Sequence, residues 1–314
     1  MVRKTVVRVV AALGLAVASV LALASPGEAT FRGQNGLIVF GAQTGDWSQL
    51  YTVRANGHAL RQITHQTNAD ATSPDWSPDG RWIVYTLENE AGAHLELIRP
   101  NGSQGHDLGA GQPACCESNA SFTPNGKHLI YERFDPATET NAIWSLDLAT
   151  LRRHLVATVD NADPNVSPDG RRISFVQFGS GDFQQGLSTI RRDGTHLRHV
   201  VPFSADVAVK QDWSPTGKRL TFSDNADLPD QSVNIATVRP DGSGLRYLTH
   251  NRSADEKSYV GSYSPDSRWI VYRQEAGGLF SLWRMHSDGS HKRQILAPST
   301  FRPRFIDWGA RAHR

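Results

Sequence analysis

The chain has 314 residues, with 33 Lys and Arg against 31 Asp and Glu, so its formal net charge is only +2. Such a balance gives no general affinity for nucleic acid, and we expect no nucleic-acid partner. The length would allow two domains, but the unbroken repeat described below favours one.

Residues 1–29 have the features of a secretory signal peptide. Its three parts are a basic start (Arg3, Lys4 and Arg8), an apolar run (residues 9–24) and a small-residue cleavage site (Gly27 to Ala29, or Ala22 to Ala24). The apolar run is shorter than the roughly 20 residues that span a bilayer, although a retained anchor is the alternative. We expect an exported, secreted or periplasmic protein without stable membrane insertion.

A turn motif recurs through the rest of the chain, residues 30–314. Its first copy is Trp76-Ser77-Pro78-Asp79-Gly80, followed by the apolar run from Trp82 to Tyr85. Proline sets the first corner of a β-turn and glycine takes a left-handed corner, so each copy predicts a β-hairpin. The prolines of the five copies, 44–50 residues apart, are Pro78, Pro124, Pro168, Pro215 and Pro265. That period is typical of a four-stranded propeller blade.

The pattern Trp-Ser-Pro-Asp-Gly-Arg-x-Ile-x-Tyr resembles the repeat of TolB-like (PD40-type, WD40-like) β-propellers, which also forms the propeller of prolyl-oligopeptidase-type enzymes. The resemblance covers nearly the whole chain after the first thirty residues. It implies an all-β propeller, but propellers of this type carry many functions. TolB also has an N-terminal α/β domain, and the residues between Ala29 and Gly36 leave no room for one, so TolB's envelope partners cannot be assumed.

Each repeat predicts four strands, A to D, with strands A and B on either side of the Pro-Gly turn. Six C strands are visible, which predicts six blades. They lie in residues 50–57, 95–102, 143–147, 187–194, 233–242 and 282–289. Residues 303–309 align with residues 74–80, and residues 35–40 align with the turn and B strand that should follow. We therefore predict that the C-terminal strand, around Phe305, completes the first blade beside Val39 and closes the ring.

This topology sorts the connections into two faces. The A–B and C–D turns should be short and basic, and the D–A and B–C connections longer and acidic. Long loops on a rigid scaffold are where binding groups usually lie. The residues predicted to bind a ligand at the mouth of the central channel are Asp70, Glu117, Asp163, Asp206, Lys210, Asp255 and Glu256. Further acids in the B–C connections include Glu88, Asp135, Asp182, Asp224 and Glu275. The alternative is that these charges only solvate the loops.

Signals for chemistry are sparse. Cys115 and Cys116 are adjacent, and a disulfide between neighbours would be strained, so a pair without catalytic duty is expected. Asp224, Asp227 and Asp230 could hold Ca²⁺, but they lack the spacing of a calcium loop, and a polar turn is the simpler interpretation. Neither Gly-x-Ser-x-Gly nor His-Glu-x-x-His occurs. We expect no catalytic residues, metal or cofactor, and we expect the tryptophans to pack between blades.

Three hypotheses follow. The first is a secreted, monomeric, non-enzymatic propeller that binds a protein segment or small ligand at an acidic channel mouth. The second is a propeller enzyme, such as a lyase or a glycan- or lactone-active hydrolase, that uses channel-mouth residues. The third is a purely structural repeat protein.

Overall fold

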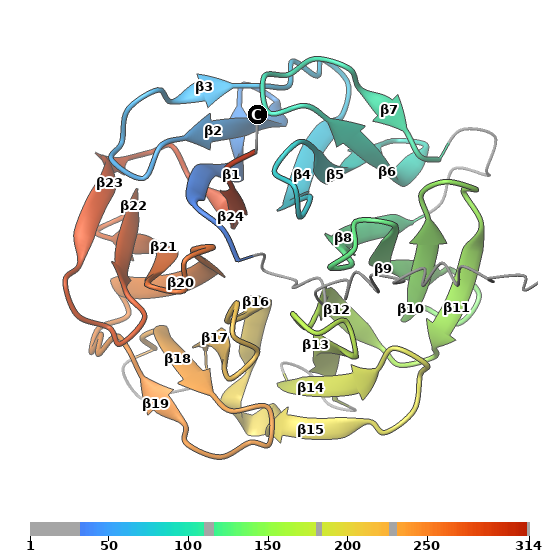
Figure 1. The fold of residues 1–314 in the computed structure, drawn as a ribbon. Helices are drawn as coiled ribbons and strands as arrows, with labels where there is room; N and C mark the ends of the chain where they lie inside the picture. Colours follow the sequence, from blue (N-terminus) through green and yellow to red (C-terminus); the bar gives the residue numbers. More distant parts are fainter. Residues whose placement is uncertain (1–31, 110–115, 180–183, 226–230, 313–314) are drawn as a thin grey trace, which may run out of the picture.

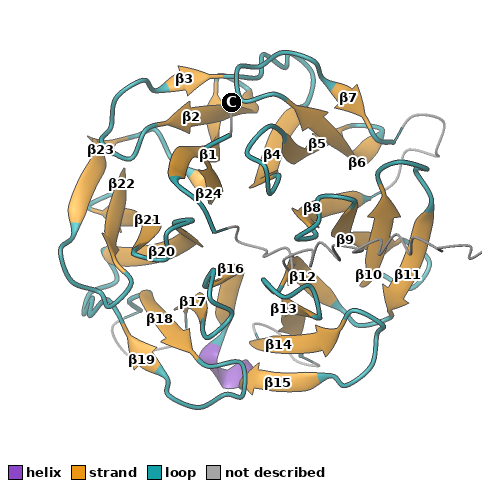
Figure 2. Cartoon of the chain, in the orientation of Figure 1, coloured by secondary structure: helices purple, strands orange, loops and turns teal. Residues whose placement is uncertain are grey.

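The protein is a ring of six four-stranded antiparallel blades around a central axis (Figures 1 and 2). The computed structural model describes residues 32–109, 116–179, 184–225 and 231–312. From the innermost strand outwards, blade A contains β24 (Arg304–Ala310), β1 (Asn35–Thr44), β2 (Trp47–Val53) and β3 (Arg61–Gln62); blade B contains β4 (Asp70–Trp76), β5 (Ile83–Asn89), β6 (Gly92–Ile98) and β7 (His106–Asp107); blade C contains β8 (Glu117–Phe122), β9 (His128–Asp135), β10 (Thr140–Asp147) and β11 (Arg153–Ala157).

The other three blades repeat the arrangement. Blade D contains β12 (Asn161–Val166), β13 (Arg172–Phe178), β14 (Gln185–Arg191) and β15 (Arg198–Val201); blade E contains β16 (Val207–Trp213), β17 (Leu220–Asp224), β18 (Asn234–Val238) and β19 (Arg246–Tyr247); blade F contains β20 (Glu256–Tyr263), β21 (Trp269–Ala276), β22 (Leu279–His286) and β23 (Arg293–Ser299). One short 3₁₀ helix, Phe203–Ala205, links blades D and E. No helix in the described ranges has the length and hydropathy needed to cross a lipid bilayer.

The Pro-Gly turns hold the hairpins through local hydrogen bonds. In blade B the hydroxyl of Ser77 accepts a bond of 2.8 Å from the backbone N–H of Trp82, and the backbone N–H of Gly80 donates to the Ser77 carbonyl at 2.9 Å. Gly80 has φ +65°, and a Cβ there would lie 2.2 Å from the Ala310 carbonyl oxygen. Glycine is therefore required both by the turn and by the close approach of β24.

The last strand closes the ring, as predicted. β24 pairs antiparallel with β1, with Val39 opposite Asp307 and Ile38 opposite Trp308. The C-terminal end of the described chain thus lies beside the start of blade A (Figure 1). Closure supplies blade A with its innermost strand, so β1 is paired on both sides, with β24 and β2.

Apolar side chains fill the spaces between neighbouring blades. Trp213, for example, is 2 % exposed and packs with Leu187 of blade D and Phe222 of blade E. Trp76 and Trp308 are buried in equivalent positions, as predicted for the repeat tryptophans. The partly buried Trp82 instead carries the guanidinium of Arg99 over its ring, 3.7 Å from the centroid. The core is thus a circle of interblade clusters.

We name the two faces of the ring by their connections. The A–B and C–D turns form the Pro-Gly face, and the D–A and B–C connections form the crossover face. The prediction that all B–C connections are long is wrong. In blades A, B and F they contain two residues each, Gly45–Asp46, Glu90–Ala91 and Gly277–Gly278, because these strands continue to the tip of a tight hairpin.

Candidate functional site

The innermost strands all carry a β-bulge at the same repeat position. The register shifts lie between Thr72 and Asp75 in β4 and at equivalent places in the other five inner strands. At four of these bulges a non-glycine residue has a left-handed φ of +48° to +52°: Ser73, Asn119, Asp163 and Phe305. Left-handed backbone is costly for such residues and gathers at functional sites. These four residues line a narrow cavity on the channel axis.

Below the bulges, a repeated hydrogen bond joins five pairs of neighbouring blades. A side chain near the end of an inner strand accepts this bond from a backbone N–H of the following blade. The pairs are Asp307 with Trp76 (2.9 Å), Asp75 with Phe122 (3.0 Å), Ser121 with Val166 (3.5 Å), Asp212 with Tyr263 (2.8 Å) and Ser262 with Trp308 (2.7 Å). Buried backbone donors are satisfied in this way, so these polar residues are structural.

Charged side chains of the inner strands, among them Asp75 and Lys210, line the channel. Burial, and then the neighbouring carboxylate of Asp307, raise the pKa of Asp75 well above its usual range. Burial alone would lower the pKa of Lys210, but Asp163 and three further carboxylates reverse this and raise it. Among the described residues, two cavities between the inner strands measure about 20 and 10 Å³, so side chains leave little space there.

Three of the predicted ligand-binding residues are engaged by their own neighbours. Glu117 is 5 % exposed and forms two hydrogen bonds to the Arg153 guanidinium, at 2.7 and 2.9 Å. The Asp70 carboxylate accepts from the backbone N–H of Ser48 at 2.6 Å. Asp206 ends the 3₁₀ helix and accepts from the Asn225 side chain at 2.9 Å.

Asp163 and Lys210 are brought together at the channel mouth. The ammonium of Lys210 lies 3.8 Å from a carboxylate oxygen of Asp163. The same carboxylate accepts from the backbone N–H of Gln211 at 2.9 Å and from the Asn165 side chain at 3.1 Å. The backbone N–H of Asp163 in turn donates to Glu132, whose pKa is raised to about 7 by burial. These residues form a connected polar network that spans blades C, D and E.

The remaining two predicted residues, Asp255 and Glu256, are exposed at the start of β20. The sequence predicted that the whole set lies in connections between strands. The structure instead puts all but Asp206 and Asp255 within the inner strands, because the bulged strands reach further toward the crossover face than the motif suggested.

A basic pocket lies beside this network on the crossover face, between blades E, F and A. Its volume is about 260 Å³. Lys210, Arg273, Arg302 and Arg304 line it together with Tyr259 and Phe305, and no described lining residue is acidic. These arginines were not predicted as site residues. Their position in the sequence could have indicated them, because Arg302 and Arg304 flank Pro303 at the start of the closing strand.

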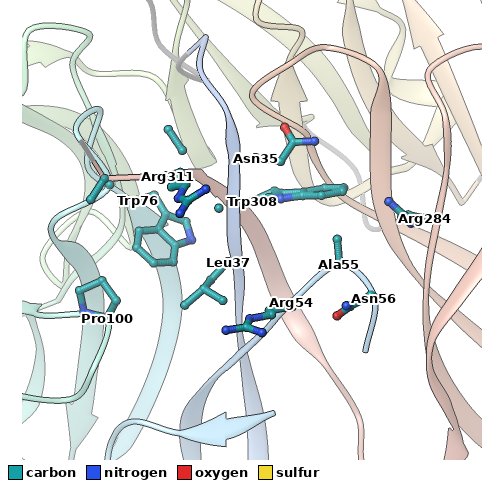
Figure 3. Close-up of a pocket in the computed structure, with 14 residues that line it drawn as sticks. Asn35, Leu37, Arg54, Ala55, Asn56, Trp76, Pro100, Arg284, Trp308 and Arg311 are labelled. Carbon is teal, nitrogen blue, oxygen red and sulfur yellow. The ribbon is translucent and has the colours of Figure 1, made fainter. Parts of the chain in front are cut away.

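A larger pocket lies on the Pro-Gly face, beside the seam between β1 and β24. It measures about 690 Å³ and is lined by Arg54, Arg284, Arg311, Trp76 and Trp308, among others (Figure 3). The buried indole N–H groups of Trp76 and Trp308 have no hydrogen-bond partner among the described residues. This pocket is the alternative ligand site to the channel mouth on the crossover face.

Some predictions fall outside the described residues. These are the signal peptide (residues 1–29), Cys115, Asp182, and the Asp227 and Asp230 part of the possible calcium segment. Cys116 is partly buried, and its carbonyl accepts from the backbone N–H of Phe134 at 3.0 Å.

Comparison with known proteins supports the repeat assignment. The family model described as the TolB beta propeller domain (PD40) matches residues 25–207. An uncharacterized protein of Agrobacterium fabrum is 28% identical over 237 residues, which cover 74% of this chain and 61% of that protein. A TolB homolog of Chlorobium luteolum is 24% identical over 272 residues, covering 82% of this chain and 56% of the homolog. The chain therefore spans less than two thirds of the length of these relatives.

Solved structures share the fold at low sequence identity. The crystal structure of TolB from Acinetobacter baumannii superposes with a TM-score of 0.74 at 18% identity, over 88% of this chain and 67% of that one. A chain of the nidogen–laminin complex gives 0.67 at 11% identity, over 87% and 98% of the two chains. The repeat, the closed six-bladed ring and the family match agree, and the chain belongs to the TolB β-propeller domain family.

Proposed function

We propose that this protein is an extracytoplasmic, non-enzymatic binding propeller that holds a protein segment or small ligand at the crossover-face mouth of its channel. The observation that carries the proposal is the ring of left-handed bulges at this mouth, at Ser73, Asn119, Asp163 and Phe305. Backbone strain of this kind is kept where it aims groups at a ligand. The filled channel beneath gives the mouth a rigid polar floor.

The predicted site residues enter the proposal in two groups. Asp163 and Lys210 form the floor, and the exposed Asp255 and Glu256 form part of the rim. Asp70, Glu117 and Asp206 support the surrounding strands through their own hydrogen bonds. Family membership and the presence of a propeller in the nidogen–laminin complex support a protein partner, and the leader-like residues 1–29 support export.

Photo-cross-linking tests the location of the site. We would replace Phe305 at the mouth by a benzophenone amino acid, and Leu151, which is exposed on the Pro-Gly face, as a matched control. In an envelope extract of the host, the probe at Phe305 should give a discrete protein adduct that unlabelled wild-type protein competes away. Adducts from the Leu151 probe alone, or no competed adduct from Phe305, would refute the mouth assignment.

A further inference from the structure

The basic pocket on the crossover face carries more positive charge than its own neighbours neutralise. It lies where β16, β20, β21 and β24 meet, and it is lined by Lys210, Arg273, Arg302 and Arg304. Of these, Lys210 is paired with Asp163 at 3.8 Å. The positive charges of the three guanidinium groups, those of Arg273, Arg302 and Arg304, need further acceptors.

A single carboxylate serves two of the three arginines. One oxygen of Glu275 lies 2.7 Å from Arg273 and 2.9 Å from Arg302, so both guanidinium groups share one acceptor. Arg273 is only 7 % exposed and also donates to the Pro303 carbonyl at 3.1 Å. Its Nε, and that of Arg302, have no hydrogen-bond partner among the described residues. Buried donors without partners are uncommon, and they indicate a place for a further acceptor.

The third arginine is closer to the open side. The Arg304 side chain lies over the Phe305 ring, 5.6 Å from the centroid, and no hydrogen bond from its guanidinium is recorded among the described residues. Burial lowers the pKa of Arg304, and the charge of Arg302 lowers it further. Burial likewise lowers the pKa of Arg273 to about 10, in spite of the attraction of Glu275. The pocket thus holds cations that repel one another, of which Arg273 is buried.

The walls of the pocket are aromatic and restrict its size. The Arg273 guanidinium lies over the Tyr259 ring at 4.3 Å, and Phe305 forms another wall. A volume of about 260 Å³ is slightly below the range of about 300–1,000 Å³ for drug-sized ligands, so it suits one or two side chains. Guanidinium groups bind planar carboxylates through paired hydrogen bonds, and a single oxygen of Glu275 already bridges two of the pocket's guanidinium groups.

We propose that this pocket binds a carboxylate of an acidic peptide segment, which Arg302 and Arg304 contact and Arg273 helps to hold. The inference rests on the proposed function and specifies the chemistry of its ligand. The sequence predicted an acidic channel mouth, whereas this pocket carries a surplus of positive charge and selects an anionic ligand. Exposed acids such as Asp255 and Glu256 lie on the same face.

Calorimetric titration with defined peptides tests the inference. The probes are blocked hexaglutamate, blocked hexaglutamine and inorganic phosphate, each titrated into the wild-type protein at 50 mM NaCl. The test variant is Arg302→Gln/Arg304→Gln. The matched control is Arg192→Gln/Lys218→Gln, which removes the same charge from exposed positions on the Pro-Gly face. We expect hexaglutamate to bind, hexaglutamine not to bind, the test variant to lose at least tenfold in affinity, and the control to stay within twofold.

Each other outcome overturns the inference. Equal losses in both variants would mean attraction by net charge alone, and saturable binding of phosphate without hexaglutamate would assign the pocket to phosphate. If hexaglutamate fails to bind while the Phe305 probe still gives its competed adduct, the carboxylate inference falls and the proposed function stands. If both experiments fail, both proposals fall.

Discussion

Closure of the ring by β24 predicts an unusual dependence on the C-terminus. Truncation after Pro303 would remove β24, including Ile306 and Trp308, which are each 2 % exposed. Removing a buried Ile side chain costs about 2–5 kcal/mol and a buried Trp about 3–5 kcal/mol. The β1 ladder and the hydrogen bonds that join β24 to its neighbours would be lost as well, at about 1 kcal/mol each.

These losses are comparable with the whole stability of a typical domain, about 5–15 kcal/mol. We therefore expect the truncated protein to lack a cooperative thermal transition, measured by circular dichroism and calorimetry. Truncation after Ala310 is the control, since it keeps β24 and, within the described part of the chain, removes the 2.8 Å bond from the Arg311 backbone N–H to the Gln34 carbonyl. If the protein ending at Pro303 melts cooperatively within about 3 °C of the full chain, the closure argument is refuted.

Three further predictions concern buried polar groups. Burial raises the pKa of Glu132 to about 7, so the carboxylate form destabilises the fold and the free energy of unfolding falls as pH rises from about 4.5 through 7. In denaturant unfolding across that range, Glu132→Gln should remove up to about 3 kcal/mol of this fall. An unchanged pH dependence would contradict the assignment. Ser262→Ala removes the 2.7 Å hydrogen bond from the backbone N–H of Trp308 and leaves this N–H its 2.8 Å bond to the Asp307 carboxylate, so the change should cost about 0.5–1.5 kcal/mol by urea unfolding; no measurable cost would show that the Ser262 bond does not stabilise the blade junction. Glu117→Gln breaks the buried pair with Arg153 and should cost about 3–5 kcal/mol, whereas the exposed Glu139→Gln should change the melting temperature little; equal effects would show that the pair is not stabilising.

The architecture was readable from the sequence because its determinants are local. A Pro-Gly turn such as Ser77 to Trp82 is held by bonds between residues at most five apart, and the regular recurrence of this turn indicated a propeller, while the six C strands gave the number of blades. Even the closure between Val39 and Asp307, distant in sequence, followed from the same local pattern at the two chain ends. The lengths of the B–C connections could not be predicted from this pattern, since several of these hairpins carry no Pro-Gly turn motif.

The candidate site depended on contacts that no local pattern encodes. Glu117 and Arg153 are 36 residues apart, and their pairing takes a predicted ligand-binding acid out of reach of a ligand. Likewise the inner-strand bulges bring Lys210 to Asp163, and the closing strand carries Arg302 and Arg304 to Arg273 of blade F. The sequence by itself determined a closed six-bladed propeller, because turn chemistry and hydrophobic alternation repeat along the chain. Only the tertiary structure decided which charges stay unpaired at the mouth, because ion pairing depends on distances across blades rather than on position within a repeat.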